Sequence, residues 1–128
     1  DEKTAEWSEI FASLERLDPV WSEILTNISL SGAERLCDLG APLGRHADEQ
    51  LLVYFVLRHL HTENCETELE NVLKFAFLSL YMIRGAATVL GNGEITLESA
   101  CEAARMYSSE IEYSDENVDE LLFELSFI

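Results

Sequence analysis

The chain has 128 residues, of which 48% are hydrophobic, so it is long enough for one domain with a core and short for two. Its 25 Asp and Glu residues outnumber its 8 Lys and Arg residues, which gives a formal net charge of −17. Nucleic acids and anionic membranes attract proteins through an excess of Lys and Arg, so this balance argues against both as partners and favours a basic protein surface.

Two helices, or one sharply kinked helix, are predicted in residues 1–30, where apolar residues recur at the three- and four-residue spacing of one helical face. Asp18-Pro19 separates them, because the residue before a proline avoids the α region and proline suits the first turn of a helix. Residues 31–47 contain three glycines and a proline. They are predicted to form a connector with at most one short helix.

Residues 48–128 are predicted to form a helical core. The run EQLLVYFVLRHLH is apolar on nearly all sides, and its length favours a helix over a buried strand. The next helix has apolar residues on two faces between Leu69 and Leu90, so we expect it at the centre of a bundle. It is expected to end at the sequence GNG, since glycine and asparagine readily adopt the left-handed cap conformation.

Two further helices are predicted, with Thr96 as the cap of the first and Ser114 or Asp115 as the cap of the second. The expected inner face of the first consists of Leu97, Ala100, Cys101, Ala104, Ser108 and Ile111. The expected inner face of the second consists of Val118, Leu121, Leu122 and Leu125. With no strand pattern and no repeat, the chain is predicted to be an all-α single bundle of five to six helices with a long central apolar helix.

Cysteine usage and the N-terminal sequence favour a cytoplasmic location. The three cysteines are dispersed, and no stretch near the N-terminus has the pattern of a signal peptide. The most apolar stretch, VLKFAFLSLYMI, has only twelve residues, so no membrane span is predicted. No metal site is expected either, because His59 and His61 in RHLHTENC are two residues apart and would point to different faces of a helix.

The most acidic segment is YSSEIEYSDENVDELLFELSFI, residues 107–128, with seven Asp and Glu residues and no Lys or Arg. It does not fit a calcium loop, because Glu120 stands where the loop requires glycine. Ser114 and the acidic residues after it suit the start of a helix. Glu110 and Glu112 precede that start, so capping does not account for them, and they are the first candidates for a site.

A polar stripe runs along the otherwise apolar central helix. It consists of Lys74, Tyr81, Gly85, Thr88 and Asn92, with Arg84 at its edge. An unpaired buried polar group costs about 1 to 3 kcal/mol, so the stripe should meet water, a partner or a cleft. Both a solvent-facing strip and a binding site fit this pattern. Arg84 is expected within ion-pair reach of Glu110 or Glu112.

Three segments, LLVYFVLRHL, VLKFAFLSLYMIR and ARMYSSEIEYSDENVDELL, resemble the C-terminal region of the flagellin lysine-N-methylase family. The resemblance covers about residues 48–125 and is most specific near residues 107–122. It implies methylation of protein lysines with S-adenosylmethionine as the cofactor of the complete protein, whose N-terminal part carries closely spaced cysteines. The cysteines of this chain are dispersed, so activity is expected to need a cysteine-rich portion absent from it, and no cofactor is expected to bind the chain alone.

The resemblance also transfers candidate contact residues onto this sequence: Tyr54, Arg58, His59, Arg84, Tyr107, Ser108, Glu110, Glu112, Ser114 and Asn117. A lysine methyltransferase needs carboxylates or tyrosines to hold the substrate ammonium and a base to deprotonate it. Glu110, Glu112 and Tyr54 are the candidates for that role. The two carboxylates also suit an interhelical clamp with Arg58 or Arg84, and we favour this second interpretation.

The sequence therefore indicates a helical domain of a flagellin lysine-N-methylase-like protein that acts in packing or substrate docking. Its expected partners are flagellin or an upstream cysteine-rich domain. The alternative is a non-catalytic acidic interaction module that binds a basic protein. A regulator that binds a small molecule has no distinguishing feature here. Phe123 and Phe127 lie four residues apart, opposite the apolar face of the last helix, and predict an interface for docking or self-association.

Overall fold

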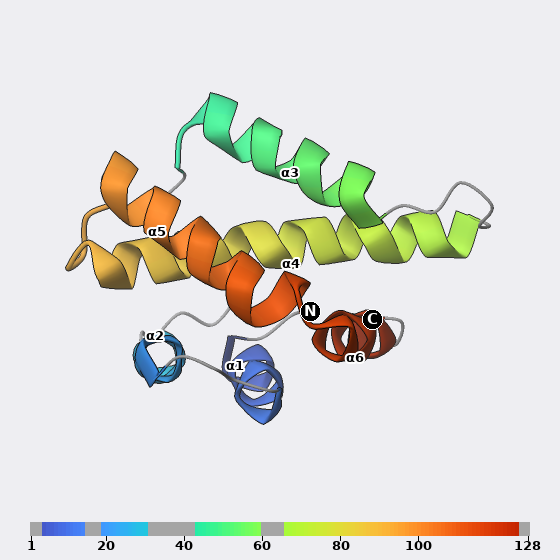
Figure 1. The fold of residues 1–128 in the computed structure, drawn as a ribbon, viewed down its shortest axis with the longest axis horizontal. Coiled ribbons are helices and arrows are strands. Elements are labelled where there is room, and N and C mark those ends of the chain that lie inside the picture. The colour runs from blue at the N-terminus through green and yellow to red at the C-terminus, as the bar shows by residue number, and fades with distance from the viewer. Residues whose placement is uncertain (1–3, 15–18, 31–42, 60–65, 126–128) are drawn as a thin grey trace.

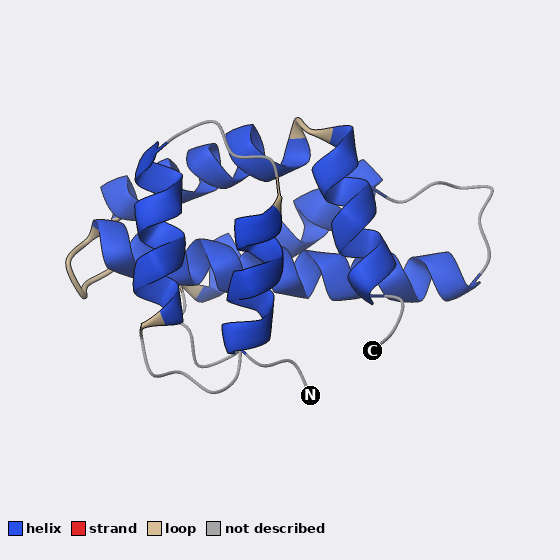
Figure 2. Ribbon diagram, turned by 90° about the horizontal axis from the view of Figure 1, so that it is seen from below, coloured by secondary structure: helices blue, strands red, loops and turns tan. Residues whose placement is uncertain are grey.

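The computed structural model describes residues 4–14, 19–30, 43–59 and 66–125. These ranges contain six α-helices and one π-helical turn: α1 Thr4–Ser13, α2 Pro19–Ser29, α3 Arg45–His59, α4 Glu66–Leu90, α5 Leu97–Tyr107, η2 Ser108–Glu112 and α6 Asp115–Leu125. No strand occurs within the described ranges (Figure 2). The predicted all-α bundle with a long apolar helix is confirmed.

Helix α4 is the central element of the bundle. It contacts α2, α3, α5 and α6, and Figure 1 shows α3 on one side of it and α1 and α2 on the opposite side. By length and composition alone, Leu69–Leu90 could also cross a membrane, as could the core helix of many bundles. Here 61% of its most apolar part is buried inside the fold, so this resemblance to a span is weak.

The N-terminal helices share one core with the rest of the chain. Trp7 and Phe11 of α1 and Trp21 of α2 are buried and belong to the same apolar cluster as residues of the four later helices. Helix α2 begins at Pro19 as predicted, while Asp18 lies outside the described residues. Helix α3 begins at Arg45, inside the predicted connector, and most of that connector lies outside the described residues.

The predicted helix caps are confirmed by the hydrogen bonds at the helix ends. The N–H of Ser99 donates to Thr96 Oγ1 at 3.0 Å, and the N–H of Thr96 donates to Ser99 Oγ at 2.9 Å, which completes a capping box. The N–H of Asn117 donates to Ser114 Oγ at 3.3 Å at the start of α6. Helix α4 ends as expected, where Gly93 takes a φ of 99°.

The inner face of α5 differs in part from the prediction, although the predicted Ile111 is buried. Leu97 is 84% exposed and Cys101 is also exposed. The buried residues of this helix are Ser99, Ala103, Met106 and Tyr107. They follow helical spacing too, but they include a serine, so hydrophobicity alone selected the wrong face. The true orientation matters because it turns Tyr107 and the residues after it toward the core.

Candidate functional site

The candidate site forms where α5 widens into η2. The N–H of Tyr113 donates to the carbonyl of Ser108 at 3.0 Å, which is the i to i−5 bond of a π-helical turn. Three consecutive residues of this turn, Glu110, Ile111 and Glu112, are buried. Single π-helical turns of this kind are frequent at functional sites. The two carboxylates that capping could not explain therefore lie in an unusual turn inside the fold.

Glu112 is the centre of a polar cluster, and its side chain is 0% exposed. Oε1 accepts hydrogen bonds from Ser108 Oγ at 2.7 Å and from the Tyr54 hydroxyl at 3.3 Å. Oε2 lies 3.0 Å from His59 Nε2 and 3.3 Å from Arg58 Nε. We call these five residues the Glu112 cluster. It joins the C-terminal half of α3 to η2.

The partners of Glu112 decide its protonation state. Burial acts to raise the pKa of its carboxyl group, but hydrogen bonds from His59 and Ser108 and the attraction of His59 and Arg58 outweigh burial. The pKa of Glu112 therefore lies below its usual value, and the group is a carboxylate at neutral pH. A buried carboxylate with four partners from its own chain has no free lone pair directed at a substrate.

Aromatic rings hold His59 in place. The ring of Phe75 meets the His59 ring edge-on at a centroid distance of 4.9 Å, and Phe55 stacks on it at 6.4 Å. Phe55 also meets the ring of Tyr107 at 5.9 Å. The imidazole is therefore positioned by packing on one side and by Glu112 on the other.

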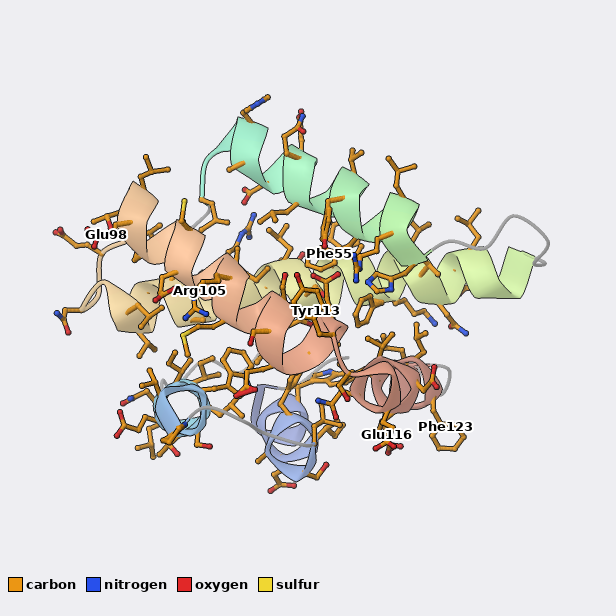
Figure 3. The ribbon with its side chains drawn as sticks, in the orientation of Figure 1. Phe55, Glu98, Arg105, Tyr113, Glu116 and Phe123 are labelled. Atoms are coloured by element: carbon orange, nitrogen blue, oxygen red, sulfur yellow. The ribbon has the colours of Figure 1, made fainter. Side chains whose placement is uncertain are left out.

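The rim of the Glu112 cluster reaches the surface. Tyr54 is partly exposed, and the side chain of Arg58 is 41% exposed. The Arg58 guanidinium lies over the ring of Tyr113 at 5.9 Å, and Figure 3 shows Tyr113 at the end of α5 and η2 that faces α3. Burial and the neighbouring Glu112 raise the pKa of Tyr54, so its hydroxyl keeps its proton at neutral pH and acts as a donor.

The predicted pairing of Arg84 with Glu110 or Glu112 is wrong. Arg84 Nη2 lies 2.7 Å from Asp48 Oδ2, and both side chains are largely buried. The reason is the path of α3, whose first turn passes beside the C-terminal half of α4 and places Asp48 next to Arg84. Asp48 also accepts a hydrogen bond from the N–H of Leu43 at 3.3 Å. The clamp that was predicted with Arg58 or Arg84 is formed by Arg58 and Glu112.

Tyr107 and Asn117 are buried residues that adjoin η2 and hold it in place. The Tyr107 hydroxyl and Ser79 Oγ are 2.8 Å apart and fully inside the core, where burial raises the pKa of the phenol. Asn117 Nδ2 donates to the backbone carbonyl of Glu110 at 2.8 Å, which ties α6 to η2. Both residues therefore act on the shape of the turn that carries Glu112.

Polar side chains of the stripe on α4 find partners within the same helix. Lys74 Nζ lies 3.6 Å from Glu70 Oε1, and the Thr88 hydroxyl donates to the carbonyl of Arg84 at 2.9 Å. Gly85 is buried. The stripe is therefore neither a wholly solvent-facing strip nor part of the Glu112 cluster.

Two other expectations concern the edges of the described structure. Phe123 is 58% exposed, and Figure 3 shows its ring pointing outward from α6, while Phe127 lies outside the described residues. The interface that these two residues suggest stays a prediction. His61, Glu63 and Cys65 of RHLHTENC also lie outside the described residues. Within the part of the chain that is described, no three His, Cys, Asp or Glu residues are grouped as metal ligands.

Sequence reasoning missed two pairs in this region, Asp48 with Arg84 and Ser79 with Tyr107. Both pairs join residues far apart in the chain, and neither has a local spacing that could have indicated it. Tyr54, Arg58 and His59 were found only through the family resemblance.

Comparison of the chain with protein-family models, with curated protein sequences and with solved structures gives no match. The functional conclusion therefore depends on the geometry of the site and on the resemblance of the three C-terminal segments.

Proposed function

We propose that this chain is the helical domain of a flagellin lysine-N-methylase-like protein and that it acts in packing or substrate docking. One observation carries the proposal. Positions that the resemblance transfers from two distant segments, Tyr54, Arg58 and His59 in α3 and Ser108 and Glu112 near η2, meet around one buried carboxylate. His59 and Tyr54 lie 53 and 58 residues before Glu112 in the chain. A chance resemblance offers no reason for the two segments to meet.

The Glu112 cluster favours a positioning role over catalysis. A substrate ammonium would have to displace Arg58 from a carboxylate that is fully buried. Tyr54 is a weak base at neutral pH because its pKa is raised. The cluster therefore fixes α3 against η2 and sets the shape of the surface around Tyr54, Arg58 and Tyr113.

The described residues do not fit S-adenosylmethionine. An adenosyl group is commonly held at a glycine-rich turn between a strand and a helix, and the described ranges contain no strand. The apolar groove between α3 and α4, lined by residues such as Val53 and Phe77, offers no polar side chain for a ribose or an amino acid group. In this proposal, methyl transfer belongs to the complete protein.

A second candidate function is a non-catalytic acidic module for a basic protein. The observation that favours it is the row of exposed carboxylates on α6, Glu116, Asp119 and Glu120, in a chain with a net charge of −17. Such a surface attracts Lys and Arg through a field that salt screens. This candidate needs no lysine methylation and no particular partner sequence.

Binding of two proteins to the immobilised chain tests both candidates, with flagellin as one analyte and the unrelated basic protein cytochrome c as the other. One triple variant carries Glu116→Gln, Asp119→Asn and Glu120→Gln. Its matched control removes the same charge from the exposed Glu9, Glu23 and Glu94.

The methylase-like proposal expects flagellin to bind more tightly than cytochrome c. Equal binding of both proteins, with both weakened more by the α6 variant than by the control variant, would favour the acidic module instead. Absence of binding by either protein would count against both candidates.

A further inference from the structure

Helix α3 is held to the bundle by little apolar burial. Among its described side chains Phe55 is the one that is buried, whereas every other described α-helix buries at least two. Val53, Tyr54 and Leu57 of the same helix are 41% to 72% exposed. Phe55 is also the one buried residue that α3 supplies to the hydrophobic core cluster. The other buried residues of that cluster lie outside α3.

Helix α3 also lies at the outside of the fold. Figure 1 shows it on the side of α4 away from α1 and α2. Its main helix partner among the described elements is α4, and its C-terminal end meets η2 through the Glu112 cluster. Elements with few buried apolar contacts open locally at a lower free energy than the whole domain. Among the described helices, α3 fits this description best.

Polar contacts near both ends of α3 add to its weak apolar packing. In its first turn, Asp48 Oδ2 lies 2.7 Å from Arg84 Nη2 of α4. In its last turn, Arg58 Nε and His59 Nε2 lie 3.3 Å and 3.0 Å from Glu112 Oε2. We call these two contacts the end clamps. Each joins α3 to a different element, α4 in the first case and η2 in the second.

The carboxylate of Glu112 depends on α3 for most of its partners. Tyr54, Arg58 and His59 all belong to α3, and Ser108 is the partner that belongs to η2 itself. Movement of α3 away from the bundle would remove the first three partners at once. It would also bring water to a side chain that is now 0% exposed. The position of α3 therefore controls access to this carboxylate.

We propose that α3 is a strap that opens as one unit while the other helices stay folded, and that the end clamps hold it closed. The closed strap keeps other molecules away from Glu112. Opening exposes this carboxylate together with the ring of Phe75, which Phe55 meets edge-on at a centroid distance of 6.1 Å. The inference stands apart from the methylase proposal, because it uses the contacts of α3 and not the resemblance.

Native-state hydrogen exchange of the complete chain tests the strap, by comparison of the backbone amides of residues 50–59 in α3 with those of α5. Arg84→Met and Glu112→Gln each remove one end clamp. Ile28→Val is the control, because it trims a buried side chain of α2, which stays folded when the strap opens. A second measurement follows access to Glu112 in Arg84→Met, which changes the opposite end of α3. The probe is a water-soluble carbodiimide with an amine, and mass spectrometry locates the labelled residue.

In the wild type, we expect the α3 amides to exchange at a lower free energy than the α5 amides and with a weaker dependence on urea. Each clamp variant should accelerate exchange in α3 by about thirtyfold or more. Arg84→Met should increase the labelling of Glu112 by a similar factor. Ile28→Val should accelerate exchange in α5 but leave α3 unchanged, because the lost packing is still present when only the strap opens.

Equal exchange free energies of α3 and α5 in the wild type would overturn the proposal, because α3 would then open only when the whole domain unfolds. Equal acceleration of both helices by Ile28→Val would overturn it for the same reason. Unchanged labelling of Glu112 in Arg84→Met would show that α3 does not move as one unit. Circular dichroism verifies that the variants are folded, and the wild type and Ile28→Val decide the outcome even if a clamp variant unfolds.

Discussion

Replacing Glu112 with glutamine tests the positioning role of this carboxylate. Glutamine keeps the shape of the side chain but removes the charge and replaces one acceptor oxygen with an amide that donates. The hydrogen bond from His59 at 3.0 Å and the ion pair with Arg58 at 3.3 Å would lose their acceptor. Arg58 can turn to water because its side chain is 41% exposed, whereas His59 is mostly buried and cannot. A lost hydrogen bond to a buried charged group costs about 1.5 to 3 kcal/mol, so we expect a loss of about 2 to 3 kcal/mol.

The effect of Glu112→Gln should depend on pH in a direction fixed by the lowered pKa. A carboxyl group whose pKa is lower in the folded state contributes its stability above its unfolded pKa, which is about 4.3 for glutamate. That contribution is lost as the pH falls through the folded pKa. The difference between the wild type and Glu112→Gln should therefore be full at pH 7 and should shrink below about pH 4.3.

Urea unfolding followed by circular dichroism at 222 nm measures this difference in the free energy of unfolding. Glu120→Gln is the control, since it removes the same charge from an exposed position of α6. The control should stay within about 0.5 kcal/mol of the wild type. A Glu112→Gln variant that is as stable as the control at pH 7 would refute the reasoning, because the buried carboxylate would then contribute nothing to the fold.

Four further outcomes are expected. Arg84→Met should lower the free energy of unfolding by about 3 kcal/mol, because it removes the ion-pair partner of Asp48 in a largely buried site. A double-mutant cycle of Arg84→Met with Asp48→Asn, measured by urea unfolding, should show that the two residues are coupled. Ser79→Ala and Tyr107→Phe should each destabilise the fold by about 1 to 3 kcal/mol in urea unfolding, because each leaves the other buried hydroxyl unpaired. The chain alone should show no S-adenosylmethionine binding by calorimetry and no methyl transfer to flagellin; micromolar binding or turnover would place the active site in the bundle. Phe123→Ser should leave the fold intact and weaken self-association or docking, and unchanged sedimentation and docking would count against that interface.

Local chemistry explains why much of the fold could be predicted from the sequence. Pro19 marks the start of α2, Thr96 forms the capping box of α5, and Ser114 caps α6. Each of these features depends on residues within one helical turn, so the sequence alone could predict it. The central place of α4 followed from its two apolar faces. These elements could be predicted without knowing how distant segments of the chain pack together.

The remaining features depend on tertiary packing. The inner face of α5 includes Ser99, a polar residue that pairs with its own cap, so hydrophobicity could not identify it. The π-helical turn has no local signal in the sequence. Arg84 was assigned the wrong partner because the path of α3, which brings Asp48 beside it, is set by packing against α4.

The most direct test of the central claim is the sequence of the gene on the 5′ side of the codon for Asp1. If this chain is the helical domain of a flagellin lysine-N-methylase-like protein, the reading frame continues upstream and encodes a cluster of closely spaced cysteines. A start codon immediately before Asp1, or an upstream segment without such a cluster, would contradict the claim.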